Sequence, residues 1–251
     1  LYFPGCGSER LHGAIAKAAI HVLLALGTRV ILTPPLLCCG FPNHANARTD
    51  SYRATLLGNT ILMSQIREMF SYLRFDAVVV TCGTCREGLD AIQLRETFGA
   101  PIVDVARFAL DHGLRLEGAR DALYHAPCHD SLSGGAAQVL GELGGYTLTD
   151  VPHCCSEAGT LALSRPDISD AMLDRKRVAL GAALATWAPQ EGANRAVILT
   201  NCPSCVQGLS RHAALAIEPR HIAVELAERL SGPDWRDRFA TQVSRATAIH
   251  I

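Results

Sequence analysis

The sequence predicts an α/β protein of two tandem domains, each a small parallel sheet flanked by helices, with the two domains related by a pseudo-twofold. Three observations favour this architecture. One cysteine pattern occurs twice along the 251 residues, and short apolar runs alternate with longer helical patterns. Hydrophobic residues make up 49 % and charged residues 19 % of the chain. That composition is typical of a globular protein with a well-buried core.

The cysteines form two sets of five, and no cysteine is left over. The first set is Cys6, Cys38, Cys39, Cys82 and Cys85; the second is Cys128, Cys154, Cys155, Cys202 and Cys205. Corresponding members are separated by 122 (6 to 128), 116 (38 to 154) and 120 (82 to 202) residues. A nearly constant offset indicates an internal repeat. We therefore expect one domain over residues 1–120 and a second over residues 121–251.

Short runs rich in β-branched residues predict buried parallel strands, and the longer stretches between them predict helices. In the first half the expected strands are Arg29–Leu32, Ala77–Val80 and Ile102–Val105. The helices expected there are Glu9–Leu26, Asp50–Leu73 and Arg86–Phe98.

The second half repeats the alternation. Ala122–His125 and Ala196–Thr200 are the expected strands, and Ala213–Leu230 contains a further strand and helix. Pro166–Ala185 is expected to be a long helix, because Pro166 and Asp167 are typical of a helix start.

Each C-x-x-C motif directly follows an expected strand. The run before Cys82 is Val78-Val79-Val80-Thr81, and the run before Cys202 is Val197-Ile198-Leu199-Thr200-Asn201. Cys128 likewise follows the strand that ends near His125. Ligands in parallel α/β sheets bind beyond the carboxyl ends of the strands. We therefore expect three segments of each set to converge at one sheet edge.

Thiolates are soft ligands that suit zinc and iron–sulfur clusters, and a helix that starts behind a C-x-x-C turn lowers thiol pKa. Disulfides are disfavoured because disulfide scaffolds are usually small and poor in core, and because adjacent cysteines do not readily bridge each other. A dithiol redox site remains an alternative. Zinc and a cubane cluster each require four ligands. A fifth cysteine per set implies either a spare catalytic cysteine or a cluster of unusual shape.

Three stretches carry a family resemblance: Leu1–Arg10, Cys154–Thr160 and Ser164–Asp167. With the doubled five-cysteine pattern, they resemble the cysteine-rich CCG domain. This domain occurs in a subunit of heterodisulfide reductase, in the glycolate oxidase iron–sulfur subunit, and in proteins for lactate utilisation and anaerobic glycerol-3-phosphate oxidation. In detail the chain resembles the C-terminal part of fused FAD-linked dehydrogenases of the D-lactate/glycolate type.

The resemblance implies that each set binds a [4Fe–4S] cluster, which gives two clusters of cubane or non-cubane type. The first cluster would be held by Cys6, Cys38, Cys39, Cys82 and Cys85, and the second by Cys128, Cys154, Cys155, Cys202 and Cys205. The second set departs from the family pattern, because Ser156 follows its cysteine pair and its first spacer is 25 residues long. Occupancy of both sites therefore stays open, and no catalytic residue is assigned.

The same resemblance implies an electron-transfer module of an FAD-linked oxidoreductase that acts on a 2-hydroxy acid. Electrons would come from FAD on an upstream domain or partner, with a ferredoxin-like iron–sulfur domain as a further partner, and pass to a quinone or another carrier. A cluster-based disulfide reductase is the first alternative, and a zinc-stabilised or metal-free interaction module is the second. The chain itself shows no G-x-G-x-x-G after a strand, so we expect no bound dinucleotide here.

Charge and hydropathy exclude other classes. The net charge is -1 and no Lys/Arg run is present, which disfavours nucleic-acid binding. No apolar stretch of bilayer-spanning length and no secretory signal occur. We expect a cytoplasmic location, with peripheral association at the inner face of the cell membrane left open. The chain begins at Leu1 without an initiator Met, so we expect further domains upstream.

Other polar residues lie near the cysteines in sequence. Histidine can ligate iron or deliver protons, but hydrogen bonding to a sulfur or carbonyl is the favoured role for four of them: His44, His125, His129 and His153. Glu157 and Arg165 are expected to cap a helix or form surface ion pairs. Asn43, Asp130 and Asn201 are expected to satisfy turns.

Overall fold

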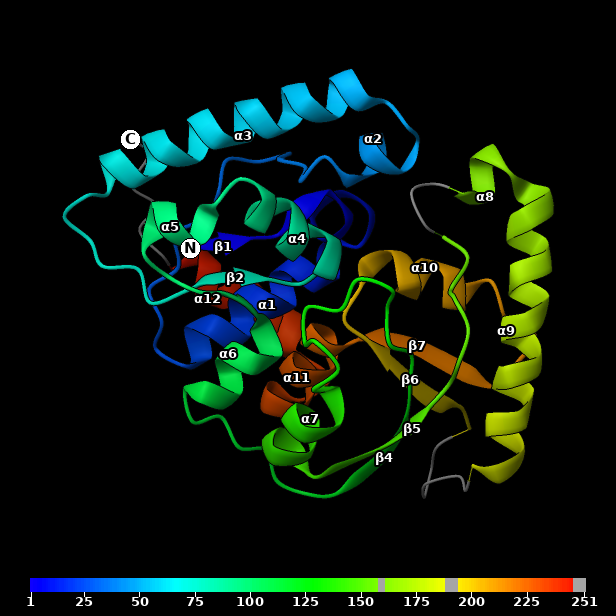
Figure 1. Cartoon of the computed structure of the whole chain (residues 1–251). Helices are drawn as coiled ribbons and strands as arrows, with labels where there is room; N and C mark the ends of the chain where they lie inside the picture. The colour runs from blue at the N-terminus through cyan, green and yellow to red at the C-terminus, as the bar shows by residue number, and fades with distance from the viewer. Residues whose placement is uncertain (158–160, 188–193, 246–251) are drawn as a thin grey trace.

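Two parallel sheets, one from each half of the chain, form the framework of the protein (Figure 1). This computed structural model describes residues 1–157, 161–187 and 194–245. The first sheet has the order β1 (Tyr2–Phe3), β2 (Val78–Val80), β3 (Ile102–Asp104). The second has the order β5 (Tyr146–Asp150), β4 (Arg120–Tyr124), β6 (Ala196–Thr200), β7 (Ile217–His221). All neighbouring strands in both sheets are parallel, which confirms the predicted α/β class.

Five of the predicted strands are confirmed. Four of them correspond to β2, β3, β4 and β6, and β6 matches the expected Ala196–Thr200 at both ends. The strand expected within Ala213–Leu230 is β7. Two further strands, β1 and β5, were not predicted. The Tyr-Thr-Leu-Thr-Asp sequence of β5 alternates apolar and polar residues, which is the pattern of a half-buried strand.

The prediction of a strand over Arg29–Leu32 is wrong. This segment makes a single β-bridge, between Leu32 and Tyr2; the Tyr2 N–H donates to the Ile31 carbonyl at 2.8 Å, and the N–H of the following Thr33 donates to the Tyr2 carbonyl at 3.3 Å. Arg29–Leu32 lies beside β1 in the first half, in the place that β5 takes beside β4 in the second half. Pro4 directly follows β1 and has no backbone N–H to extend the pairing in that direction.

Helices surround both sheets. The first half contains a π-helical turn, η1 (Gly7–Leu11), followed by α1 (Gly13–Ala25), α2 (Phe41–Ala45), α3 (Thr49–Met69), α4 (Gly83–Ala91), α5 (Leu94–Phe98) and α6 (Val105–Asp111). The second half contains α7 (Ala136–Gly144), α8 (Leu161–Ser164), α9 (Pro166–Thr186), α10 (Pro203–Ser210), α11 (Ile222–Ser231) and α12 (Trp235–Ser244).

The predicted long helices differ in their continuity. Pro166–Ala185 is confirmed as α9, and Asp50–Leu73 corresponds to α3, which ends earlier, at Met69. The expected Glu9–Leu26 helix is broken at His12, between η1 and α1. The expected Arg86–Phe98 helix is divided into α4 and α5, because Gln93 adopts a left-handed φ of 55° that no α-helix continues through.

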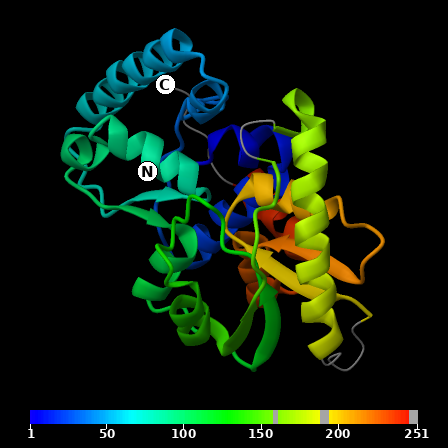
Figure 2. The ribbon, with the colours of Figure 1, turned by 45° about the vertical axis from the view of Figure 1, so that its right-hand side comes forward.

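The two halves share one hydrophobic core. Its buried residues come from α1, α6, α7, α11 and α12, and include Val22, Leu140, Leu226 and Trp235. Figure 2 shows α1 in blue close to the red and brown C-terminal helices, in agreement with the extensive contact between α1 and α11. The C-terminal helices of the second half are therefore part of the packing of the first.

Two helix caps tie the halves together at the cysteine end of the sheets. Asp104 caps α6 by accepting from the Ala106 N–H, and its other oxygen accepts a 2.5 Å hydrogen bond from Ser131. His221 caps α11, and its Nε2 lies 2.9 Å from the Thr81 carbonyl oxygen. Each cap thus reaches a residue of the opposite half.

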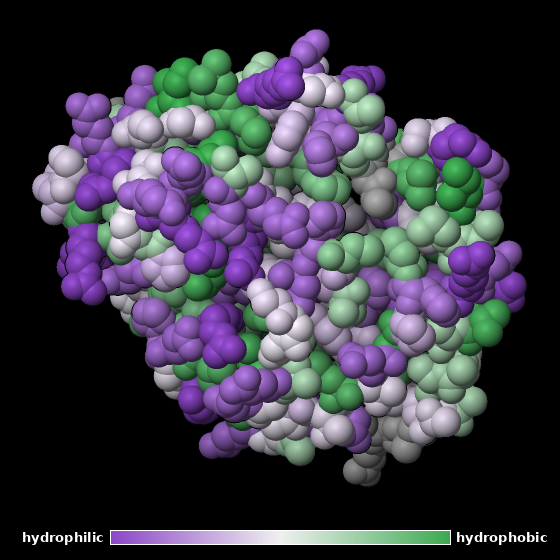
Figure 3. All heavy atoms as spheres, viewed as in Figure 1, coloured by the Kyte–Doolittle hydropathy of each residue, from purple (hydrophilic) through white to green (hydrophobic). Residues whose placement is uncertain are grey.

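The surface mixes hydrophilic and hydrophobic side chains (Figure 3). Exposed apolar side chains include Leu57 and Ile61 on α3 and Leu163 on α8, which lie at the outer edges of the two halves. Among the described helices, none has the length and apolar character needed to cross a membrane.

Candidate metal centre

The first cysteine set is assembled from three segments at the carboxyl edge of the first sheet. Cys6 follows β1, Cys82 follows β2, and Cys85 lies in the first turn of α4. The Cys38 and Cys6 sulfurs lie 3.6 Å apart, within hydrogen-bonding distance, and the Gly40 N–H donates to the Cys38 sulfur at 3.4 Å. A hydrogen bond with Cys39 is the main reason that the pKa of the Cys85 thiol is raised. All five predicted residues of this set therefore come together.

The second set repeats this arrangement. Cys128 donates to Cys154 over 3.9 Å, and Cys205 donates to Cys155 over 3.2 Å. The Ser156 N–H donates to the Cys154 sulfur at 3.4 Å, as the Gly40 N–H does to Cys38 in the first set. Cys128 is exposed, whereas Cys155, Cys202 and Cys205 are buried. The predicted second set is thus also assembled, with one sulfur at the surface.

The two sets meet at Cys82 and Cys202. The pKa of Cys82 lies well below its ordinary value. The main cause is a hydrogen bond from Cys202, and the second is a hydrogen bond from Cys85. The buried cysteines of both sets also pack in one cluster, so the sulfurs form a continuous row across the boundary between the halves. Its order is Cys6, Cys38, Cys39, Cys85, Cys82, Cys202, Cys205, Cys155, Cys154, Cys128.

Within the row the thiols share protons. Hydrogen bonds from Cys39 and Cys6 lower the pKa of Cys38 to about 3. The hydrogen bond to Cys38 raises the pKa of Cys39 to about 12. A donor thiol therefore stabilises a thiolate on its neighbour. Since the thiolate is the form that binds metals, the packing of the row prepares it for soft metal ions.

Glycines allow the paired cysteines to approach the helices behind the C-x-x-C turns. A Cβ atom on Gly88 of α4 would lie 2.8 Å from the Cys39 Cβ, and one on Gly208 of α10 would lie 2.1 Å from the Cys155 carbonyl oxygen. Both glycines occupy the same place in the sequence C-x-x-C-x-x-G. Sequence reasoning missed them, although the repeated motif was a visible signal.

All ten cysteines are free. The sulfur pairs that hydrogen-bond lie 3.2–3.9 Å apart, well beyond the roughly 2.05 Å of a disulfide. Grouped sulfur donors, helix N-termini behind Cys82 and Cys202, and backbone N–H groups directed at sulfur fit an iron–sulfur group. The residues present therefore match the cofactor that the sequence pattern predicts.

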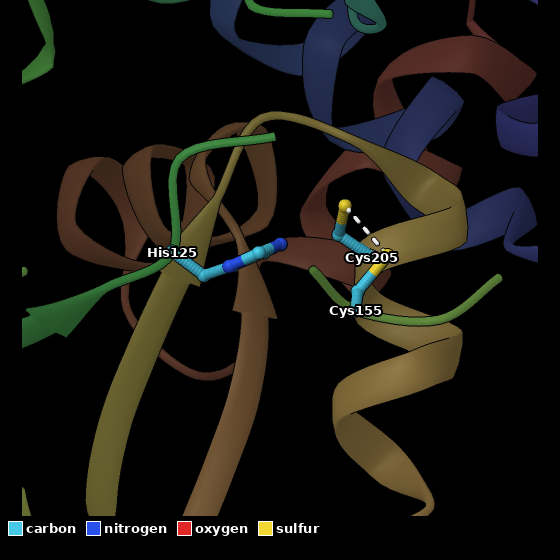
Figure 4. A group of neighbouring side chains, drawn as sticks. All are labelled: His125, Cys155 and Cys205. Carbon is cyan, nitrogen blue, oxygen red and sulfur yellow. Dashed lines mark hydrogen bonds between the residues drawn. The ribbon is translucent and has the colours of Figure 1, made fainter. Parts of the chain in front are cut away.

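His125 lies beside the second set. Its side chain extends from the end of β4 toward Cys155 and Cys205, and the three potential ligand atoms lie within 4.8 Å of one another (Figure 4). His125 is buried, and its Nε2 has no hydrogen-bond partner among the described residues. Hydrogen bonds from Cys154 and then Cys205 are the main causes that lower the pKa of Cys155, and the neighbouring His125 acts in the same direction. The ring is therefore placed beside the sulfurs, as predicted, but it forms no hydrogen bond to either sulfur.

Lys176 contacts the Nδ1 atom of His125, and the sequence analysis did not predict this contact. This fully buried side chain places Nζ 2.9 Å from His125 Nδ1, and donates to the carbonyl oxygens of Val151 at 2.7 Å and Pro152 at 2.9 Å. Burial lowers the pKa of Lys176 to about 8, while Cys155, Cys205 and Cys154 act in the opposite direction. Its helical spacing from the buried Leu180, four residues later, was the available signal.

The contacts of His129 and His44 are with side chains other than the predicted sulfur or carbonyl groups. His129 Nδ1 lies 2.5 Å from a Glu87 carboxylate oxygen, and the His44 ring lies 4.8 Å from the Tyr52 ring. His153 is exposed, with a left-handed φ of 72°. Among the described residues, none of these three belongs to a group of potential metal ligands.

The remaining polar predictions agree with the structure. Arg165 forms an exposed ion pair with Asp167 at 2.6 Å, and Glu157 pairs with Arg211 at 3.3 Å. Asp130 closes its own turn by accepting from the backbone N–H groups of Leu132 and Gly134.

The two predicted asparagines have different partners. Asn201 donates to the Asp130 carboxylate at 2.7 Å and to the Ser131 hydroxyl at 2.9 Å, so that it fixes the loop after Cys128. The Asn43 carbonyl accepts from the Arg48 N–H in the turn after α2.

Comparison with known proteins identifies the class. The CCG family model, described as a cysteine-rich domain, matches residues 1–90 and 122–210. The chain therefore belongs to the cysteine-rich CCG domain family and contains two copies of the domain.

Several proteins of this kind are similar over most of the chain. One subunit of the anaerobic glycerol-3-phosphate dehydrogenase of Escherichia coli K12 is 27 % identical over 246 residues, which cover 92 % of this chain and 59 % of that protein. The glycolate oxidase iron-sulfur subunit of the same organism is 27 % identical over 206 residues, covering 72 % and 48 %. Lactate utilization protein A of Exiguobacterium is 24 % identical over 196 residues, covering 69 % and 77 %. The chain thus spans less than two thirds of the first two relatives.

Similarity to solved structures is weaker. A glutamate racemase from Bacillus anthracis aligns over 95 % of this chain and 82 % of its own, with 16 % sequence identity and a TM-score of 0.41. A likeness of this size indicates no shared function.

Proposed function

We propose that this chain is an iron–sulfur electron-transfer module, and that its ten cysteines hold two [4Fe–4S] clusters. Cys6, Cys38, Cys39, Cys82 and Cys85 would hold one cluster, and Cys128, Cys154, Cys155, Cys202 and Cys205 the other. Such clusters supply one-electron redox chemistry at potentials set by hydrogen bonds to sulfur, charge and exposure. We assign the two sites to repeats at residues 1–120 and 121–251.

The observation that carries this proposal is the single row of sulfurs. Two sites far apart would serve separate roles, but these sets are in contact through buried Cys82 and Cys202. One end of the row, at Cys128, is exposed. The protein residues thus offer a buried path for electrons with one end open to a partner. A zinc-stabilised interaction module needs neither the contact between sets nor the fifth cysteine of each set.

The names of the relatives suggest the larger assembly. Subunits of an anaerobic glycerol-3-phosphate dehydrogenase and of a glycolate oxidase are similar to this chain. We infer that the module belongs to an oxidoreductase in which a flavin domain or subunit oxidises a 2-hydroxy acid. A ferredoxin-like iron–sulfur domain would deliver electrons to the module, and a quinone or another carrier would accept them. Peripheral attachment to the inner face of the cell membrane would suit a quinone acceptor.

Metal and sulfide analysis tests the proposal. The chain is purified without oxygen, and iron, zinc and acid-labile sulfide are measured per chain, together with the visible absorbance before and after dithionite. We expect about eight irons and eight sulfides, as two four-iron clusters require, and a brown colour that bleaches on reduction. Zinc without sulfide, or a colourless chain without either metal, would contradict it.

A further inference from the structure

Two pairs of equivalent positions differ in charge and in hydrogen-bonding capacity between the sets. His125 follows Tyr124 and precedes Cys128 by three residues, as Phe3 follows Tyr2 and precedes Cys6. Lys176 is the eleventh residue of the 21-residue helix α9, and Asn59 is the eleventh residue of the 21-residue helix α3. The second set therefore has a basic pair where the first has a phenyl ring and an amide.

The contacts of Lys176 determine how His125 is protonated. A lysine ammonium has three donors and no acceptor. Two donors are used by the carbonyl oxygens of Val151 and Pro152, and the third points at His125 Nδ1, 2.9 Å away. Nδ1 must therefore accept, and the ring proton of the neutral imidazole resides on Nε2. This nitrogen, at the outer end of the ring, points toward Cys155 and Cys205 (Figure 4).

The same geometry disfavours His125 as a metal ligand. A ligating histidine normally donates its second ring N–H to a carboxylate or carbonyl, which makes the ring a better ligand. Here the second nitrogen faces an ammonium group, which withdraws electron density instead. His125 thus directs an N–H toward the sulfurs, where it has no other partner among the described residues, and Lys176 is the residue that orients it.

A buried positive charge and an N–H donor to sulfur both stabilise the more negative, reduced state of an iron–sulfur site. In the first set, the equivalent Asn59 is neutral and donates to the Cys38 carbonyl oxygen at 2.9 Å, and Phe3 offers no donor. We propose that Lys176 and His125 make the second cysteine set the higher-potential site of the two. This inference rests on the proposed function. An electron shared by the sites would then reside on the second set, next to the exposed Cys128.

Other charges near the sulfurs do not reverse this order. The buried Asp104 carboxylate interacts with Cys82 of the first set, where a negative charge lowers the reduction potential. Glu157 interacts with Cys155 of the second set, but Arg211 lies 3.3 Å from its carboxylate and offsets its charge. The transfer itself moves one electron, oxidising the first site and reducing the second, and breaks no bond.

A redox titration followed by EPR tests the proposal in the full chain. The two midpoints are assigned with Cys38→Ser/Cys39→Ser, which removes the first site, and Cys154→Ser/Cys155→Ser, which removes the second. In the parent chain we expect the second site to have the higher midpoint. Lys176→Met should reduce the equilibrium constant for its reduction at least about tenfold, about 59 mV for one electron. The midpoint of the first site should stay in place.

His125→Phe, which copies Phe3, is the second variant and retains the lysine. It should lower the midpoint of the second site by a smaller amount than Lys176→Met does. If Lys176→Met loses iron, His125→Phe tests the proposal in its place. Asn59→Gln is the matched control on α3 and should leave the second midpoint unchanged. A lower midpoint at the second site, or unchanged midpoints in both variants with full iron content, would overturn the proposal. Absence of iron and sulfide from the parent chain would instead overturn the proposed function.

Discussion

The turn that carries the adjacent cysteines has one backbone shape in both halves but a different residue after the pair. Gly40 has φ +91° and Ser156 has φ +72°, and both donate a backbone N–H to the first cysteine of their pair at 3.4 Å. A Cβ atom on Gly40 would lie 2.9 Å from the Tyr52 ring. Tyr52 is the fourth residue of α3, and the fourth residue of α9 is the smaller Ser169.

These turns show that the backbone around the sulfurs is the same in both halves. A larger residue after the cysteine pair is matched by a smaller residue on the helix that covers the turn. The serine after the second cysteine pair, which looked like a departure from the family pattern, preserves the N–H to sulfur geometry because a smaller helix residue faces it. The cysteine environment thus depends on the helix that covers each turn. The following experiments test how far the two halves are equivalent.

The largest effect is expected from Gly208→Ala. Its Cβ would lie 2.1 Å from the Cys155 carbonyl oxygen, so the cysteine turn must move. We expect unfolding in urea to become easier by about 3 kcal/mol or more, with loss of iron from the second set only. Gly88→Ala should act in the same way on the first set, by about 1–3 kcal/mol, because the closest atom lies 2.8 Å away.

Gly181→Ala on α9 is the control for these variants. Nothing lies within 4 Å of its added Cβ, so a gain of about 0.5–1 kcal/mol is expected from helix propensity. Equal iron content in Gly208→Ala and the parent chain would show that close approach of α10 is not required for the site.

The two helix caps should give opposite dependences of stability on pH. Burial lowers the pKa of His221 to about 4 from about 6.5. The unfolded chain therefore binds more protons in this window, and stability is lost as the pH falls from about 6.5 to 4, by at most about 3 kcal/mol. His221→Asn keeps a capping residue and should remove this slope. Urea unfolding at half-unit pH intervals measures it, and an unchanged slope would contradict the assignment.

Asp104 provides the contrasting case. Burial raises its pKa from 3.8 to about 6, so the folded chain binds more protons between these values. Its contribution therefore lowers stability as the pH rises from about 4 to 6. Asp104→Asn should make the measured curve rise more steeply with pH in this range. A flatter curve would mean that the carboxylate is stabilised in its charged form.

Exchange of the residue after the cysteine pair should have a smaller effect. Gly40→Ser places a side chain against Tyr52 and should destabilise the chain by about 1–2 kcal/mol in urea unfolding. The double variant Gly40→Ser/Tyr52→Ser recreates the second half and should recover part of that loss. Additive effects of the two substitutions would show that the turn and the helix are not coupled.

The reverse exchange, Ser156→Gly, should have the smallest effect. The left-handed φ of 72° suits glycine, and the buried Ser156 hydroxyl has no partner among the described residues, so its removal costs little. We expect a change below about 1 kcal/mol in urea unfolding and no loss of iron. A large destabilisation would indicate a role for the hydroxyl that the geometry does not explain.

The sequence predicted the repeat, the α/β class and the convergence of each cysteine set, because cysteine spacing and strand-ending motifs are local signals. It could not predict that Cys82 meets Cys202, since a repeat describes each half alone and packing between halves decides their relation. It also missed Lys176, because a lysine within a long helix ordinarily faces solvent. Arg29–Leu32 was wrongly predicted as a strand, because β-branched residues favour an extended backbone but do not show how many ladder hydrogen bonds form.

EPR of the reduced chain tests the central claim, that the two cysteine sets form adjoining sites, most directly. The dithionite-reduced parent chain is compared with Cys38→Ser/Cys39→Ser and Cys154→Ser/Cys155→Ser, which each retain one set. The contact between Cys82 and Cys202 predicts magnetic interaction between the sites, seen as broadened or split signals that become simple in either variant. A parent spectrum equal to the sum of the two variant spectra would contradict it.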